Sequence, residues 1–194
     1  MARPREFDER EVVGQALEVF WSQGYQATSV QDLVNATGLE RGSLYGAFGD
    51  KRGLFTSCLD AYMAHAHARF DAMVGAAEDP AEGLRAFVRA AGEDCRYAPV
   101  AGRGCLLGNT FGEIEAHDEA TRDRVEGYIT GMQTRMASAL RRAQRLGTFD
   151  PRRDARAVGT LIQCSLQGLS ILSRSRPSAR LVRATTEEIV RILD

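Results

Sequence analysis

Residues 28–51 read TSVQDLVNATGLERGSLYGAFGDK. Ser29 precedes the apolar residues of a short helix, and Asp32 follows three positions later, a spacing typical of a helix N-terminus. Gly38 is placed to end that helix, and a second short helix is expected over about Arg41 to Phe48. Two short helices that are joined by a tight turn containing glycine are typical of a helix-turn-helix. We therefore predict this motif.

The remainder of the chain also favours helices. Apolar residues recur every three or four positions, and no stretch shows the sustained alternation of a strand. We predict an all-α protein of about nine helices, in which an N-terminal unit (residues 1–50) precedes a larger helical body (residues 51–194). The other helices are expected from about Glu9 to Gln23, Asp50 to Val74, Pro80 to before Pro99, Cys105 to Ala116, Asp118 to Gly147, Asp150 to Arg174, and after Pro177.

Composition excludes several classes of protein. Of the 194 residues, 44% are hydrophobic and 26% are charged, which is the balance of a globular chain and not of a disordered one. No apolar stretch is long enough to span a bilayer, and the N-terminus does not resemble a signal peptide. We therefore expect a cytoplasmic protein that does not contact a membrane. Its four widely spaced cysteines are expected to be free thiols.

Net charge gives no general attraction to nucleic acid. The whole chain carries −1, and residues 1–60 hold six Lys plus Arg against nine Asp plus Glu. Any nucleic-acid binding must therefore depend on where particular charges lie. The second helix of the predicted motif offers such residues. Leu44 and Phe48 fill its inner face, so Arg41, Ser43 and Tyr45 face outward, where an arginine can bond guanine edges in a major groove.

The same stretch, with the helix before it, resembles the tetracycline-repressor (TetR) family of bacterial transcription regulators. The resemblance covers about the first 55 residues. One departure is Glu40, where many members carry Ser or Thr as the cap of the recognition helix. The matching residues are Ala16, Phe20, Gly24, Tyr25, Thr28, Ser29, Val30, Leu33, Ala36, Thr37, Gly38, Leu39, Gly42, Ser43, Leu44, Tyr45, Phe48, Gly49, Asp50, Lys51 and Leu54.

The resemblance implies that the protein binds a pseudo-palindromic, double-stranded operator through this motif. It implies that Arg41, Gly42 and Ser43 face bases, and that Thr28, Tyr45 and Lys51 contact phosphates, with Ser29 beside them. Arg3 and Arg5 form a basic arm for a neighbouring minor groove, or a disordered tail. Core packing is the alternative for Tyr45, and a solvated charge is the alternative for Lys51.

The resemblance also implies a homodimer that is built on the last two helices. Apolar residues on these two helices recur at near-heptad spacing and form a stripe, a pattern that suits helix pairing. The alternative is that the stripe packs only within one chain. The expected interface residues are Val158, Leu161, Ile162, Ser165, Leu169, Leu172, Val182 and Ile189.

A ligand pocket is expected among the middle helices. Cys105 lies near a helix N-terminus and near Arg103, two features that favour a thiolate. Its segment also looks like one in a TetR subgroup that includes electrophile-sensing repressors, although a cysteine among apolar helices is more often inert packing. Cys58, Cys95 and Cys164 are expected in the core. The candidate pocket residues are Tyr62, Phe70, Phe87, Tyr97, Cys105, Asn109, Phe111, Tyr128 and Gln163.

Three functions remain open from the sequence. The first is a DNA-binding repressor that a small-molecule inducer releases from its operator. The second is a thiol-based electrophile or redox sensor that uses Cys105 on the same scaffold. The third is a helical enzyme or carrier that has lost DNA binding. The chain contains no catalytic motif, no cofactor-binding motif and no metal-ligand spacing, since His65 and His67 fall on different sides of a helix.

Overall fold

The computed structural model describes residues 7–96, 102–113 and 118–194. Within these ranges the chain forms nine α-helices and no strand, which confirms the all-α prediction. A π-helix, η1 (Asp71–Gly75), continues α4, and a short 3-10 helix, η3 (Ser173–Ser175), follows α8. The α-helices are α1 (Glu9–Gln23), α2 (Val30–Thr37), α3 (Arg41–Phe48), α4 (Lys51–Phe70), α5 (Pro80–Asp94), α6 (Leu106–Gly112), α7 (Glu119–Leu146), α8 (Ala155–Leu172) and α9 (Ala179–Arg191).

Capping side chains explain most of the helix starts. Asp8, Ser29, Asp50, Asp79, Asp118, Asp154 and Ser178 each accept a hydrogen bond from a backbone N–H of the first turn. Such a cap stabilises a helix by about 1 kcal/mol. The side chains that precede α3 and α6, Glu40 and Cys105, make no cap hydrogen bond. The departure from Ser or Thr at Glu40 therefore leaves α3 without a side-chain cap.

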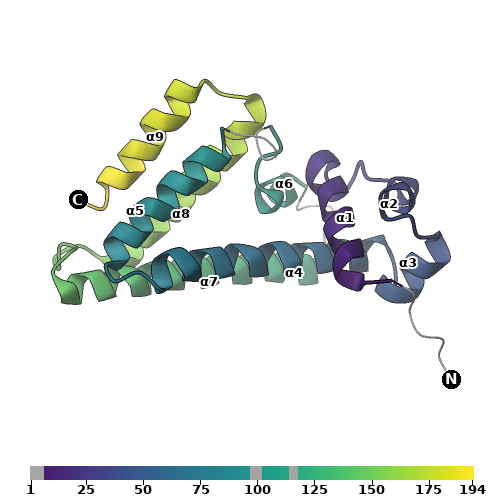
Figure 1. Ribbon diagram of the computed structural model, residues 1–194, viewed down its shortest axis with the longest axis horizontal. Coiled ribbons are helices and arrows are strands. Elements are labelled where there is room, and N and C mark those ends of the chain that lie inside the picture. The colour runs from purple at the N-terminus through teal and green to yellow at the C-terminus, as the bar shows by residue number, and fades with distance from the viewer. Residues whose placement is uncertain (1–6, 97–101, 114–117) are drawn as a thin grey trace.

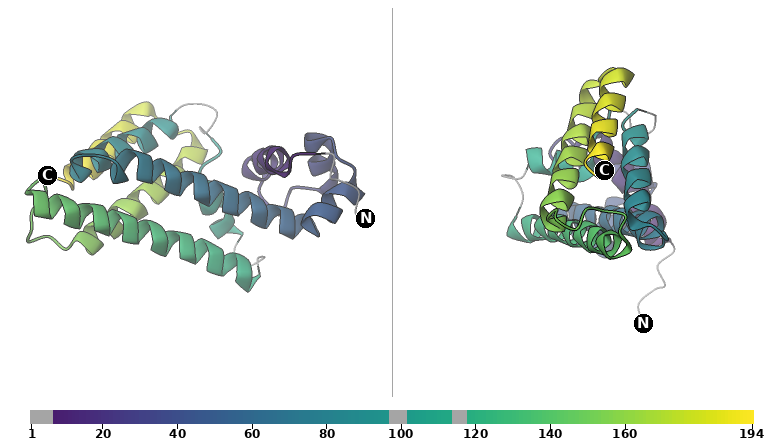
Figure 2. Two further views of the ribbon diagram at one scale, coloured as in Figure 1. Left: turned by 60° about the horizontal axis from the view of Figure 1, so that its bottom comes forward. Right: turned by 90° about the vertical axis from the view of Figure 1, so that its left-hand side faces the viewer.

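The helices are arranged along one long axis. Helices α1, α2 and α3 cluster at the end where the chain starts, and α4 and α7 run lengthwise beside each other away from that cluster (Figure 1). Helices α5, α8 and α9 pack at the opposite end, close to the C-terminus (Figure 2). No helix among the described residues combines the length and apolar character that a membrane span requires.

Two hydrophobic clusters hold this arrangement together. In the first, Phe20 of α1 packs edge-on against Phe55 of α4 with ring centroids 5.0 Å apart, and Leu33 and Leu44 join them. The second cluster contains residues of α5, α7, α8 and α9 together with Phe70. Each fully buried side chain of this size contributes about 1.5–3 kcal/mol of transfer free energy. Because α4 contributes to both clusters, it joins the N-terminal unit to the helical body.

The predicted start of α8 is wrong. Asp150-Pro151 forms part of a turn, and α8 begins at Ala155, where Asp154 accepts hydrogen bonds from two backbone N–H groups. Gln144 explains the difference because its Nε2 donates to the carbonyl oxygens of Asp150 and Arg153, at 3.0 and 2.8 Å. Those carbonyls are thereby satisfied in a turn. Helix α6 ends at Gly112, and the rest of its expected length, residues 114–117, lies outside the described residues.

Candidate DNA-binding surface and ligand cavity

The helix-turn-helix forms as the sequence predicts. Gly38 adopts a left-handed conformation with φ of +67°, which ends α2 and lets the chain turn into α3. Leu33 and Leu44 are buried between the two helices and α1. On the opposite side of α3, Arg41, Gly42 and Ser43 are exposed. The motif therefore presents one cation and two small residues at the start of α3.

Two aromatic rings hold the cations of this surface. The Arg41 guanidinium lies over the Tyr45 ring, 5.1 Å from its centroid, and the Lys51 ammonium lies 4.5 Å from the centroid of Tyr25. Such contacts contribute about 0.5–1 kcal/mol at exposed sites. Burial lowers the pKa of Lys51, and the carboxylate of Glu113 partly opposes that effect. Lys51 is thus held against the protein surface, and Tyr45 serves as a platform for Arg41.

The structure corrects the role expected for Thr28. Its side chain is 1% exposed, and its hydroxyl donates to the carbonyl oxygen of Gly24 at 2.6 Å. The Thr28 hydroxyl is therefore not available to a phosphate. Ser29 is exposed, but its hydroxyl is part of a capping box with Asp32. Arg3 and Arg5, the expected basic arm, lie outside the described residues.

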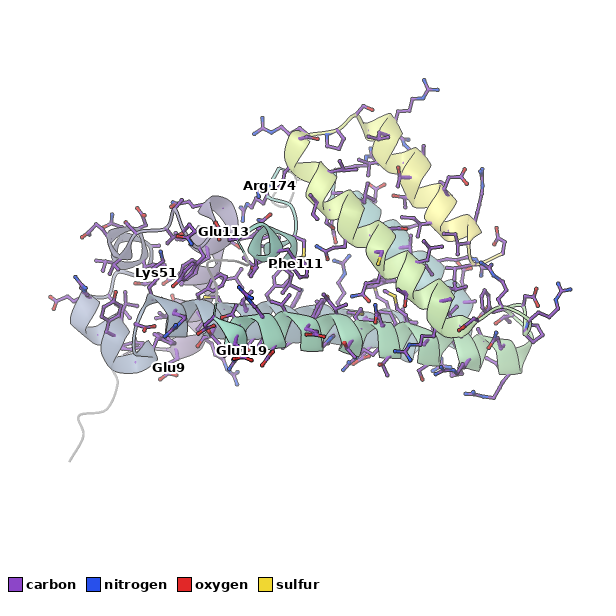
Figure 3. The ribbon with its side chains drawn as sticks, turned by 180° about the vertical axis from the view of Figure 1, so that it is seen from behind. Glu9, Lys51, Phe111, Glu113, Glu119 and Arg174 are labelled. Carbon is purple, nitrogen blue, oxygen red and sulfur yellow. The ribbon has the colours of Figure 1, made fainter. Side chains whose placement is uncertain are left out.

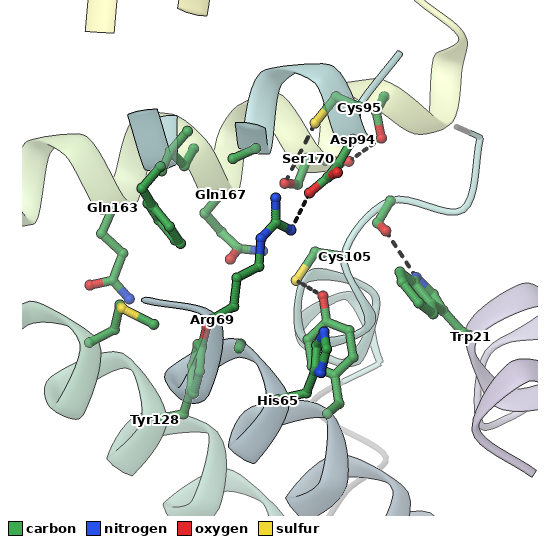
Figure 4. Close-up of a pocket in the computed structure, with 18 of the residues that line it drawn as sticks. Trp21, His65, Arg69, Asp94, Cys95, Cys105, Tyr128, Gln163, Gln167 and Ser170 are labelled. Carbon is green, nitrogen blue, oxygen red and sulfur yellow. Dashed lines mark hydrogen bonds and ion pairs between the residues drawn. The ribbon is translucent and has the colours of Figure 1, made fainter. Parts of the chain in front are cut away.

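A cavity of about 480 Å³ lies in the helical body. Residues of α4, α5, α7 and α8 form most of its wall, and Gly104 and Trp21 of α1 also line it (Figure 4). Its volume is in the range of cavities that bind small organic molecules. Five of the expected pocket residues line it, namely Tyr62, Phe87, Cys105, Tyr128 and Gln163.

The other expected pocket residues have different roles. Phe70 is buried in the core, with its ring centroid 5.2 Å from that of Phe87. Asn109 donates to the carbonyl oxygen of Arg103 and accepts from Arg174. Phe111 packs against the first hydrophobic cluster, the one that contains Phe20. The expectation that these three side chains line the pocket is therefore wrong, and Tyr97 lies outside the described residues.

Sequence reasoning missed most of the polar wall. Arg69 of α4 forms an ion pair with Asp94 of α5, and both side chains line the cavity. They are 25 residues apart on different helices, so no spacing in the sequence relates them. Gln167 was also missed, although it lies one helical turn after Gln163 and therefore on the same face of α8. Ser170, Ser173, Cys95, His65 and Trp21 also belong to this wall.

The surroundings of Cys105 differ in part from the expectation. The Tyr62 hydroxyl donates a hydrogen bond to Cys105 Sγ at 3.4 Å, and burial, followed by the neighbouring thiol, raises the pKa of Tyr62. Arg103 turns away toward α1, where it pairs with Glu18 and lies over the Trp21 ring. The Cys105 thiol is therefore in contact with Tyr62, whereas the Arg103 side chain is directed at Glu18 and Trp21. Within the described ranges, no three His, Cys, Asp or Glu side chains gather as metal ligands would.

Two protein-family models match the chain. Residues 80–188 match the model described as "Tetracyclin repressor-like, C-terminal domain", which covers more than half of the 194 residues. Residues 13–58 match the model described as "Bacterial regulatory proteins, tetR family". The chain belongs to the TetR family. It is a DNA-binding transcriptional regulator, as the resemblance at residues 28–51 implied.

This TetR-family protein is similar to several named transcription regulators. It is 29% identical to the transcriptional repressor ComR of Escherichia coli (strain K12), over 91% of this chain and 84% of that protein. It is also 29% identical to the repressor BdcR of the same strain, over 94% and 87%. Among solved structures, a cysteine-substituted CifR regulator in complex with 26-bp operator DNA is 28% identical, with a TM-score of 0.84 and full coverage of both chains.

The TetR-family body carries an exposed apolar stripe that contains two of the expected residues, Leu161 and Leu172, but not the buried ones. Val158, Ile162, Leu169, Val182 and Ile189 are buried within the chain's own core, so they are not available to a partner copy. Leu161 and Leu172 remain exposed by 51% and 53%, and Ser165 is half-buried. The exposed stripe on α8 and α9 consists of Leu161, Cys164, Ile171, Leu172 and Leu181. Cys164 therefore does not lie in the core.

Helix α6 joins the cavity of this TetR-family protein to its helix-turn-helix. Cys105, which precedes α6, lines the cavity, and Glu113, which follows α6, reaches the turn between α1 and α2 (Figure 3). The Trp21 indole donates to the carbonyl oxygen of Gly104 at 2.9 Å, which fastens α1 to the cavity rim. The DNA-binding unit is therefore in contact with the cavity wall through α6 as well as through α4.

Proposed function

We propose that this protein is a transcriptional repressor that leaves its operator when a small molecule occupies the 480 Å³ cavity. The observation that carries the proposal is that α4 both starts beside α3 and lines the cavity, through Tyr62 and Arg69. The relatives ComR and BdcR are transcriptional repressors, which supports the proposal, as does the operator complex of the CifR variant.

DNA is recognised by α3 in this proposal. Arg41, Gly42 and Ser43 face base edges in a major groove, and Lys51 and Tyr45 contact the phosphate backbone on either side. Residues 1–50 form the DNA-binding domain, and residues 51–194 form the ligand-binding and dimerisation domain. The protein works in the cytoplasm, and the proposal includes no enzymatic step.

A homodimer forms through the exposed stripe of α8 and α9 that contains Leu161 and Leu172. Pairing two copies there buries apolar side chains that one chain leaves in water. A two-fold dimer presents two copies of α3 to a pseudo-palindromic operator, with half-sites roughly 34–36 Å apart. The spacing of the two recognition helices then decides affinity.

Release requires a ligand that binds one dimer geometry better than another. The ligand acts on α4 beside Tyr62 and on the segment before α6 beside Cys105. Helix α4 begins at the DNA-binding unit, and α6 ends beside it, so a shift of either helix moves α3 relative to its copy. The half-site spacing is then lost, and the affinity for the operator falls.

The experiment is an unbiased selection of DNA by the purified protein, followed by fluorescence anisotropy with the selected duplex. We expect a two-fold symmetric sequence and salt-dependent binding. Failure to enrich any sequence would contradict the proposal and favour a helical enzyme or carrier. Genes next to the selected sequence then suggest candidate inducers to add to the bound complex.

A second candidate function is supported by the position of Cys105. Its sulfur lines the cavity and accepts the hydrogen bond of Tyr62, so an electrophile that enters the cavity reaches the thiol. Alkylation with N-ethylmaleimide would then release DNA from the parent protein but not from Cys105→Ser. If the two proteins respond alike, the thiol is structural and the inducer binds without a covalent bond.

A further inference from the structure

Two residues of the DNA-binding unit line the cavity directly. They are Leu17 and Trp21 of α1, whereas the other helices that line the cavity belong to the helical body. Leu17 and Trp21 are four positions apart in the sequence, so they lie on the same face of α1. Both side chains are half-buried. The cavity wall therefore includes one face of a helix that packs against the helix-turn-helix.

The Trp21 side chain is fixed where the DNA-binding unit meets the cavity wall. Its Nε1 donates a hydrogen bond to the carbonyl oxygen of Gly104 at 2.9 Å (Figure 4). Its ring meets the Tyr62 ring edge-on, with the two centroids 5.3 Å apart. The Arg103 guanidinium lies 5.7 Å from the centroid of the Trp21 ring and pairs with Glu18 of α1. The indole is therefore in contact both with α4 and with the segment that precedes α6.

The backbone of Gly104 explains why the acceptor of this hydrogen bond belongs to the helical body. Gly104 has a φ of +71°, a conformation that residues with a side chain rarely adopt. A Cβ atom added there would lie 3.2 Å from the carbonyl oxygen of Ser170 and 2.8 Å from Cγ of Arg174. Glycine thus permits a close approach to α8 and to the residues that follow it. A shift of α1 relative to the helical body therefore acts on the hydrogen bond from Trp21.

Helix α1 also connects Trp21 to the recognition helix. Phe20, the residue before Trp21, is fully buried and belongs to the hydrophobic cluster that contains Leu33 of α2 and Leu44 of α3. Because such cores are close-packed, a displacement of α1 shifts the helices that pack against it. One face of α1 thus lines the cavity, and another holds α2 and α3.

The surface that α1 presents to the cavity is apolar. The one N–H group of the Trp21 indole is already donated to Gly104, and Leu17 has no polar atom in its side chain. Apolar and aromatic residues such as Phe87 and Leu166 line the cavity elsewhere. Apolar walls are typical of cavities that bind the hydrocarbon part of small organic molecules. The part of a ligand that reaches α1 is therefore hydrocarbon.

We infer that the apolar body of the effector packs directly against Leu17 and Trp21, and that its binding displaces α1 and breaks the hydrogen bond from Trp21 to Gly104. This inference rests on the proposed ligand-controlled function and names how that same cavity is read. Helix α1 is then a third connection between the cavity and α3, beside α4 and α6. The hydrogen bond is intact when the operator is bound and broken when the effector is bound.

A contact quencher tests the position of the ligand. Trp21 is the single tryptophan of the chain, so tryptophan fluorescence reports this position alone. The probes are 1,4-dibromobenzene and p-xylene, which are uncharged and nearly equal in shape. Bromine quenches an excited indole that it touches, and a methyl group does not. We expect 1,4-dibromobenzene to quench most of the fluorescence and p-xylene to restore it by competition. Binding by calorimetry without quenching, or no binding of either probe, would overturn the inference.

The selected operator tests the displacement of α1. Operator and probe must change each other's affinity by the same factor. The operator should weaken p-xylene binding by about tenfold in the parent protein and by less than about twofold in Trp21→Phe, which keeps a ring but lacks the N–H donor. Ser22→Ala, at an exposed neighbour on α1, is the matched control and should keep the factor of the parent. The parent factor in Trp21→Phe, or no factor in the parent protein, would show that α1 is not a connection.

The two measurements separate this inference from the proposed function. Quenching requires no DNA, so a protein that shows it but selects no operator contradicts the repressor proposal and leaves the contact between ligand and α1 standing. A protein that releases the operator when p-xylene binds, but whose Trp21 is not quenched by 1,4-dibromobenzene, overturns the inference and leaves the repressor proposal standing.

Discussion

The backbone N–H of Tyr25 donates a hydrogen bond to the carboxylate of Glu113, with 2.9 Å between N and Oε2. Tyr25 lies in the turn between α1 and α2, and Glu113 follows α6, whose other end borders the cavity. The backbone N–H of Gln26 approaches the second carboxylate oxygen at 3.5 Å. A Cβ atom added at Gly24 would lie 2.6 Å from that same oxygen, so glycine permits this approach. The contact ties the DNA-binding unit to the segment that borders the cavity.

Removing this contact should weaken both stability and signalling. In Glu113→Ala the N–H groups of Tyr25 and Gln26 lose their acceptor, which should cost about 1–2 kcal/mol of unfolding free energy at this partly exposed site. We expect a lower urea midpoint and less DNA release at saturating ligand. Glu126→Ala, an exposed glutamate on α7, is the control. The same midpoint and the same release as the parent protein would show that α6 does not couple the two sites.

Arg41 should provide sequence-specific affinity. Its guanidinium is exposed at the start of α3 and is held over Tyr45, so Arg41→Ala should lose about 1–3 kcal/mol of binding free energy. The loss should be larger for the selected operator than for random duplex, because a base contact carries the specificity. Anisotropy titrations on both duplexes measure it. Arg145→Ala, near the far end of α7, is the control. An equal loss on the two duplexes would mean that Arg41 binds phosphate instead.

Lys51 should behave differently because its charge is directed at the backbone of DNA. Lys51→Ala should weaken binding to all duplexes to a similar degree, and the slope of log K against log salt should fall by about one. Titrations at several salt concentrations provide the slope. Lys51→Arg keeps the charge and should restore most of the slope. An unchanged slope in Lys51→Ala would remove this residue from the phosphate contacts.

Leu161 should lie at the centre of the dimer interface. It is 51% exposed in one chain, so Leu161→Glu would leave the chain folded but bury an unpaired charge in the dimer. Sedimentation should show folded monomers with weak operator binding. Leu146→Glu, at a leucine 57% exposed at the end of α7, is the matched control and should remain dimeric. Leu169→Glu should instead unfold the chain, because Leu169 is buried in the core. A dimeric Leu161→Glu protein would place the interface elsewhere.

Thiol reactivity should report the same interface. Cys164 is exposed in one chain and lies on the stripe with Leu161, so dimerisation should protect it and Leu161→Glu should release it to 5,5′-dithiobis(2-nitrobenzoate). Cys58 should stay unreactive in both proteins at pH 8, because burial raises its pKa to about 12 from 9.0. Because the pKa of Cys58 is higher in the folded than in the unfolded chain, its contribution to the free energy of unfolding is fully present below pH 9. That contribution is lost as the pH rises toward 12. Equal Cys164 rates in the two proteins would contradict the proposed interface.

The sequence by itself determined the helices and the DNA-binding motif. Their signals are local: Ser29 and Asp32 cap α2, Gly38 ends it, and the caps at Asp8 and Asp118 place α1 and α7 within one residue of expectation. Capping and left-handed glycine depend on neighbours within four positions, which a sequence shows directly. The one displaced start, that of α8, involves Gln144, whose amide reaches across a turn to Asp150 and Arg153.

Only the tertiary structure decided which face of each helix packs in the core, which lines the cavity and which is exposed. Helix α8 is apolar on more than one side. The spacing of its apolar residues therefore did not separate Ile162 and Leu169, which are buried, from Leu161 and Leu172, which are exposed. The cavity wall shows the same limit, because the Arg69–Asp94 pair joins two helices whose relative position comes from core packing. The Glu113–Tyr25 contact, which spans 88 positions, is a third case. Long-range packing selects these contacts, and no local spacing encodes them.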